Sequence, residues 1–167
     1  MKNLILRFKK LHDKLFGLVS YAQTPFLLFV RLYWGLQLVE SGWGKLHHLD
    51  KVTEFFTSLG LPMPGSTAVF ISSLEFFGGI LLAAGLFSRV ISLLLTVNLI
   101  TAYITADRVA LLSIFSDPDK FMAAAPFTFL FASLLILIFG PGKIAVDALL
   151  GRWFAAPQEQ GRGSASN

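Results

Sequence analysis

The strongest constraint on the fold is a set of four apolar runs, each close to the roughly 20 residues that a helix needs to cross a bilayer. The runs lie at about 25–46, 66–87, 89–106 and 122–139. Only 14% of the residues are charged and 54% are hydrophobic, whereas an average soluble domain carries about 25% charged residues. We therefore expect an all-α membrane protein: an antiparallel four-helix transmembrane bundle with amphipathic interfacial helices.

The segments around these runs divide the chain into three predicted parts. Residues 1–22 place apolar side chains at helical spacing between basic ones, which indicates an amphipathic helix on an anionic membrane surface, or else a frayed basic tail. Residues 23–154 form the transmembrane domain, with short amphipathic helices expected at 50–59, within 109–121 and up to about residue 154. Residues 155–167 are polar and expected to be disordered.

The distribution of basic residues predicts the orientation in the membrane. With the N-terminus inside, nine lysines and arginines flank the spans on the inner side and four on the outer side, which favours two cytoplasmic termini. The net charge of +4 does not indicate nucleic-acid binding, because the basic residues sit at the edges of apolar runs. The absence of cysteine excludes disulfides, thiolate metal sites and iron–sulfur clusters formed by this chain.

Glu75 is the only charged residue between Glu54 and Arg89. A carboxylate inside a membrane span costs about 2.5–3.5 kcal/mol on insertion scales, so such a residue normally faces a bundle interior and marks a functional site. At 1.5 Å per residue, Glu75 lies about 13 Å from the outer end of its span, near the midplane. Asn98 lies at a similar depth on the next span, on one stripe with Thr101.

Arg31 is the partner that we expect for Glu75, because an extended arginine can close the roughly 7 Å between the depths of their backbones. Three interpretations remain open. The pair fixes the helix register; or Glu75 and Asn98 line a pocket that opens toward the membrane; or Glu75 stays protonated and solitary, since burial disfavours its charged form.

Other side chains in the spans extend the candidate site. Glu40 lies inside the first run, and Trp34 is deep enough in that run to face a ligand. The candidate ligand-binding residues are Arg31, Trp34, Glu40, Glu75, Phe76, Asn98 and Thr101, with Glu75 as the candidate proton carrier. No metal is expected: His47 and His48 are weak candidates, because adjacent residues point in different directions on a helix and no third ligand completes a set.

Several of these residues fall into a pattern that resembles the DoxX family. The similarity covers roughly residues 25–150 and rests on elements in the expected order. These are Arg31 with Gly35 and Gly42-x-Gly44-Lys45, Leu74-Glu75-x-x-Gly78-Gly79 with Gly85, Phe121 with Pro126-Phe127, and Gly140-Pro141-Gly142-Lys143-x-x-x-Asp147. The resemblance implies a four-span protein of the bacterial inner membrane, similar to the membrane subunit of thiosulfate:quinone oxidoreductases. A thiol relay, which some related membrane proteins use, is excluded because the chain has no cysteine.

The hypothesis that follows is a membrane subunit of a redox complex that binds a quinone near Glu75. An apolar cleft with a few polar groups suits a hydrophobic ring, which Trp34 or Phe76 could stack against. Asn98 or Arg31 could donate to its carbonyl, and Glu75 could carry the proton. Electrons would come from a soluble redox enzyme or substrate, and homo-oligomers are compatible with the sequence. The alternatives are a scaffold that recruits a soluble enzyme, and a small proton-coupled transporter.

Overall fold

The computed structural model describes the backbone of residues 2–155 and, within that range, the side chains of residues 12, 21–151 and 153. The regular secondary structure over this range is helical and contains no strand, which confirms the all-α part of the expected fold. The helices are α1 (Lys2–His47), α2 (Leu49–Ser58), α3 (Pro64–Ala84), α4 (Ser88–Thr105), α5 (Arg108–Leu112), α6 (Pro118–Ala123), α7 (Pro126–Phe139) and α8 (Val146–Ala155).

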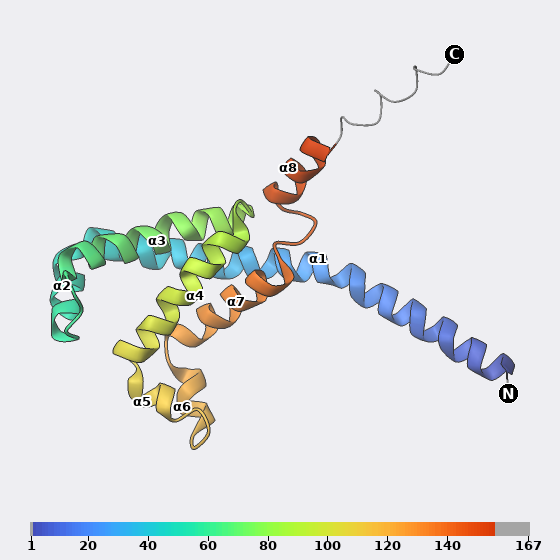
Figure 1. Ribbon diagram of the computed structural model, residues 1–167, viewed down its shortest axis with the longest axis horizontal. Helices are drawn as coiled ribbons and strands as arrows, with labels where there is room; N and C mark the ends of the chain where they lie inside the picture. Colours follow the sequence, from blue (N-terminus) through green and yellow to red (C-terminus); the bar gives the residue numbers. More distant parts are fainter. Residues whose placement is uncertain (1, 156–167) are drawn as a thin grey trace, which may run out of the picture.

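The long helices α1, α3, α4 and α7 pack in a ring, with the most extensive contacts between α1 and α3 and between α4 and α7. Figure 1 shows these two pairs diverging from the α3–α4 turn, while the N-terminal half of α1 projects beyond the bundle. The core between them is built from buried aliphatic side chains, including Leu38, Leu82, Leu95 and Ile136. We call the end where α1 meets α2 the α2 end, and the end at the α3–α4 turn the α8 end.

Within the described residues, two helices, α3 and α4, are long and apolar enough to cross a membrane. The apolar α7 is shorter, at 14 residues, because the segment expected as one span from 122 breaks between α6 and Pro126. The expected short helices at 50–59 and within 109–121 appear as α2, α5 and α6. The helix expected from Ser66 starts earlier: α3 begins at Pro64, after Met63 in the left-handed conformation.

The first apolar run is not a separate helix, because α1 is continuous from Lys2 to His47 and holds Pro25 in its interior rather than in its first turn. The side chains of 2–11 and 13–20 lie outside the described residues, so the surface-bound amphipathic helix stays a prediction. The tail expected to be disordered also lies outside them, apart from Ala155 at the end of α8.

Helices α1 and α3 approach closely because glycines replace side chains along their contact. A methyl group at Gly42 would lie 2.8 Å from the Phe76 Cα and from the Ser72 carbonyl oxygen, closer than real Cβ contacts. A methyl group at Gly79 would lie 2.7 Å from the Gly35 carbonyl oxygen and 2.8 Å from the Val39 nitrogen. Small residues let the backbones of membrane helices approach closely, and the resulting van der Waals packing helps to hold the helices together in apolar lipid.

Asp147 joins the α7–α8 loop to the α3–α4 turn at the α8 end. Its carboxylate accepts hydrogen bonds from the backbone nitrogens of Phe87 (2.8 Å) and Ser88 (2.9 Å), while its own nitrogen donates to the Gly85 carbonyl (2.9 Å). These bonds satisfy N–H groups at the start of α4, which have no partners inside the helix. They also hold Phe87 at φ +50°, a conformation unusual for a bulky residue.

Replacement of Asp147 by alanine is expected to lower the free energy of unfolding by about 1–2 kcal/mol, the typical cost of losing a helix cap. Asp147→Asn keeps an acceptor oxygen but loses the charge, so its loss should be smaller. Denaturant titration of the purified protein in detergent, followed by circular dichroism, measures both. Equal stability of Asp147→Ala and the wild type would contradict the capping role.

Candidate functional site

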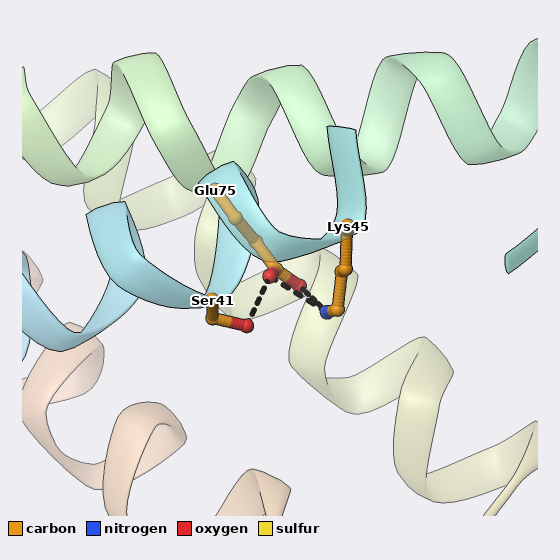
Figure 2. A network of polar contacts seen from close by, with 3 residues as sticks. All are labelled: Ser41, Lys45 and Glu75. Atoms are coloured by element: carbon orange, nitrogen blue, oxygen red, sulfur yellow. Dashed lines mark hydrogen bonds and ion pairs between the residues drawn. The ribbon is translucent and has the colours of Figure 1, made fainter. Parts of the chain in front are cut away.

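Glu75 is held by two side chains of α1. Lys45 Nζ lies 2.6 Å from both carboxylate oxygens, and the Ser41 hydroxyl donates to Oε2 at 2.9 Å. Figure 2 shows the carboxylate reaching from α3 toward these two groups. The Glu75 side chain is 7% exposed, whereas that of Lys45 is 36% exposed. The site is therefore an ion pair with one deep member and one member near the surface.

The positions of these residues follow from the helix geometry. Ser41 and Lys45 are four residues apart, so they lie one above the other on one face of α1. Gly42 lets the α3 backbone approach that region of α1 around Ser72 and Phe76, which brings Glu75 within hydrogen-bond reach of both donors. The close glycine contact and the ion pair are thus parts of one arrangement.

The expected Arg31–Glu75 pair is wrong. Arg31 is buried at 1% exposure and donates from Nη2 to the Ile144 carbonyl oxygen at 2.6 Å, at the α8 end of the bundle. Asp147 is close enough to attract the Arg31 guanidinium electrostatically. The physical reason is proximity: Arg31 finds the Ile144 carbonyl oxygen at its own depth, while Lys45 reaches inward from the helix end to Glu75.

A pocket of about 480 Å³ lies beside the Glu75–Lys45 pair, between α1, α2, α3, α4 and α7. We call it the bundle pocket. Its walls are mainly apolar, with aromatic rings from Phe55 and Phe56 on α2 and Phe129 on α7. Its polar side chains are Ser41, Lys45, Lys51, Glu75, Asn98, Thr101, Thr105 and Asp107.

Asn98 and Thr101 line the bundle pocket from α4, together with Glu75, as the sequence had placed them. The Thr101 hydroxyl donates to the Val97 carbonyl at 2.9 Å. The half-buried Asn98 carboxamide makes no hydrogen bond to any of the residues that the structure describes. It therefore presents a free donor and a free acceptor to whatever occupies the pocket.

A second, more open hollow of about 470 Å³ adjoins the bundle pocket at the α2 end. It is lined by Gln37, Glu40, Ser41, Gly44, Lys45, His48, Lys51 and Val52. We call it the outer hollow. Glu40 belongs to it and not to the bundle pocket, so the structure separates two acids that the sequence grouped in one candidate site.

The two candidate stacking rings lie elsewhere. Trp34 packs against the hydrophobic core and makes an edge contact with Tyr33, while Phe76 contacts Trp43 with ring centroids 5.4 Å apart. Neither ring lines the bundle pocket. The aromatic rings that line the bundle pocket belong instead to the phenylalanines of α2 and α7.

The adjacent histidines close the C-terminal end of α1. His47 Nδ1 is 2.9 Å from the Trp43 carbonyl oxygen, and His48 Nδ1 is 3.0 Å from that of Gly44. Over the described part of the chain, no group of three or more metal-ligating side chains comes together.

Lys45 and Ser41 are the site residues that sequence reasoning missed. In the sequence, Lys45 is a flanking charge at the outer end of the first span and part of the Gly42-x-Gly44-Lys45 element, and neither feature identifies it as the partner of Glu75. The spacing of a hydroxyl and an amine at i and i+4, next to a glycine that permits close approach, was the available signal.

Comparisons with known proteins agree with the residue pattern. The family model named DoxX matches residues 26–108. The chain is 30% identical over 122 residues to a Bacillus subtilis (strain 168) protein named "Putative oxidoreductase CatD", covering 72% of this chain and 83% of that protein. It is 25% identical over 127 residues to "Inner membrane protein YqjF" of Escherichia coli (strain K12), covering 75% and 92%. No solved structure matches the chain.

Proposed function

The chain belongs to the DoxX family, and we propose that it is a bacterial inner-membrane subunit of a redox complex that binds a quinone in the bundle pocket. The observation that carries this proposal is the charged Lys45–Glu75 pair beside a largely apolar pocket, with the free carboxamide of Asn98 on another wall. The names of the two relatives, an oxidoreductase and an inner-membrane protein, support it.

The proposed topology has four spans, formed by the second half of α1 and by α3, α4 and α7, with both termini in the cytoplasm. At 1.5 Å per residue, α3 and α4 are about 32 and 27 Å long, close to the roughly 30 Å of a hydrocarbon core. Helix α7 is about 21 Å long and would require local thinning of the bilayer or snorkelling of its flanks. Its packing against α4 and α1 supports a place within the bundle.

The chemistry of the pocket suits a ring with polar oxygens. Apolar walls hold the ring, and a few placed polar groups fix its orientation, as in small-molecule sites generally. Lys45 has a proton to donate to a ligand oxygen, Glu75 holds the ammonium in place, and Asn98 can donate to or accept from a second oxygen. The chain supplies binding and proton exchange; electrons would come from a partner redox enzyme or a soluble substrate.

The Lys45→Met variant tests quinone binding. Loss of a hydrogen bond to a charged donor is expected to cost about 1.5–3 kcal/mol, so the Kd for a short-chain ubiquinone or menaquinone should rise roughly 10- to 100-fold. Glu75→Gln removes the negative charge that holds the Lys45 ammonium in place, so it should also raise the Kd. Calorimetric titration of protein in lipid nanodiscs measures these values.

The matched control is Lys120→Met, because Lys120 is an exposed residue of α6 that lines neither space. Its Kd should equal that of the wild type. Chromatography of the purified protein should also detect a co-purified quinone. Absence of bound quinone together with no measurable Kd in the wild type would overturn the proposal.

A further inference from the structure

The outer hollow exposes a polar stripe on a helix that we place in the membrane. Gln37, Glu40, Ser41 and Gly44 recur at helical spacing, so they share one face of α1, and all of them line the hollow. His48, directly after the end of α1, lines it as well. No atom lies within 4 Å of the position that a Cβ would take at Gly44, so this face opens into free space.

An exposed carboxylate at this depth needs water. Glu40 lies about 10 Å along the helix from the end of α1 at His47. Its side chain is exposed, and it makes no hydrogen bond or ion pair to the side chains that the structure describes. Contact with hydrocarbon disfavours an ionised carboxylate, whereas a water-filled hollow removes that cost.

The outer hollow and the bundle pocket adjoin at Lys45. The two spaces share four lining residues, Ser41, Lys45, Lys51 and Val52. Lys45 is partly exposed, while Glu75, which it contacts at 2.6 Å, is nearly buried. The ammonium group is therefore the point where the water-facing hollow meets the apolar pocket.

We propose that the outer hollow is an aqueous vestibule through which the Lys45–Glu75 pair exchanges protons with the water at the α2 end. A proton that leaves Lys45 for an oxygen of a bound ligand is replaced by one from vestibule water, which restores the ammonium. Glu40 and His48, which line the vestibule, are placed to relay that proton. The transfer to a ligand rests on the proposed function; the vestibule itself does not.

Cysteine accessibility tests the vestibule directly, because the chain has no cysteine of its own. Single substitutions Gln37→Cys and Gly44→Cys place thiols in the outer hollow. Leu36→Cys is the matched control on the same helix: Leu36 is 61% exposed but does not line the hollow, so in the membrane it faces lipid. The probe is a charged, membrane-impermeant methanethiosulfonate reagent, added to proteoliposomes of known protein orientation.

The vestibule thiols should react roughly 100-fold faster than the control thiol, because the thiolate reacts and an apolar environment suppresses it by about two pKa units or more. Reaction should occur from the side that holds the α2 end. Equal rates at positions 36 and 44, or reaction from the opposite side alone, would overturn the proposal. Spontaneous crosslinking between Gly44→Cys chains without labelling would also overturn it, since a second copy would then fill the hollow.

A second measurement connects the vestibule to the ion pair. A water-soluble carbodiimide should modify Glu75, as seen in its peptide by mass spectrometry. A bulky thiol reagent attached to Gly44→Cys should lower the modification of Glu75 to the background level seen in the Glu75→Gln variant. The same reagent attached to Ser113→Cys, in the α5–α6 connection, should leave the modification of Glu75 unchanged. Unchanged modification of Glu75 would overturn the connection. Fast thiol labelling without quinone binding would keep the vestibule and reject the proposed ligand.

Discussion

A methyl group at position 42 is expected to be among the most damaging small changes in this protein. In Gly42→Ala the new Cβ would clash with the Phe76 backbone nitrogen and lie 2.8 Å from the Phe76 Cα and the Ser72 carbonyl oxygen. These neighbours are backbone atoms of α3, which cannot rotate away as the end of a side chain can. Overpacking of this kind costs about 1–3 kcal/mol, because a whole helix has to shift.

The same shift should damage the site. Ser41 and Lys45 flank Gly42 on α1, and both bind Glu75 on α3 at distances of 2.6–2.9 Å. Separation of the helices by even part of an ångström lengthens these bonds, and quinone affinity should fall together with stability. The free energy of unfolding in detergent and the calorimetric Kd measure the two effects.

Gly44→Ala is the matched control, two residues along the same helix. A Cβ there meets no atom within 4 Å, so the variant should be neutral or more stable by about 0.5–1 kcal/mol, the usual gain from glycine to alanine inside a helix. Equal stability of Gly42→Ala and Gly44→Ala would show that α1 and α3 are not closely packed at this point.

Much of this arrangement could be predicted from the sequence. The apolar runs predicted the long helices, because the length of an apolar run is visible in the composition of the sequence and does not depend on how the side chains pack. Helical spacing placed Glu75, Asn98 and Thr101 where they could share a pocket, and the structure brings all three to one.

The ion-pair partner could not be predicted, because depth along two helices does not determine their relative rotation or shift. On depth alone, Arg31 lay within a side chain's reach of Glu75, whereas Lys45, at the outer end of its run, lay about 12 Å away. The choice depends on the close contact of Gly42 with the Ser72–Phe76 segment, and on the Ile144 carbonyl, which comes from a loop distant in sequence. The expected helix start at residue 25 is wrong for a separate reason: a proline inside a membrane helix is tolerated where neighbouring groups satisfy the freed backbone carbonyl.

The α8 end carries the second large effect, at Gly85. This residue ends α3 with φ +76°, in the left-handed conformation, where a side chain costs about 1–2 kcal/mol. A Cβ there would also clash with the Arg31 guanidinium and lie 2.7 Å from the Ala145 Cβ. Overpacking adds about 1–3 kcal/mol, so Gly85→Ala should destabilise the protein by roughly 2–5 kcal/mol in total.

Gly60→Ala separates the two contributions. Gly60 has φ +70° but meets no atom within 4 Å of its Cβ position, so its alanine variant should lose only the conformational part, about 1–2 kcal/mol. The difference between the two variants then measures how tightly the Arg31 guanidinium, the Ala145 methyl and the α3–α4 turn are packed. Denaturant titration in detergent gives both free energies of unfolding. Equal losses would mean that Arg31 can move aside, and that the α7–α8 loop does not fix its position as the hydrogen bond to the Ile144 carbonyl indicates.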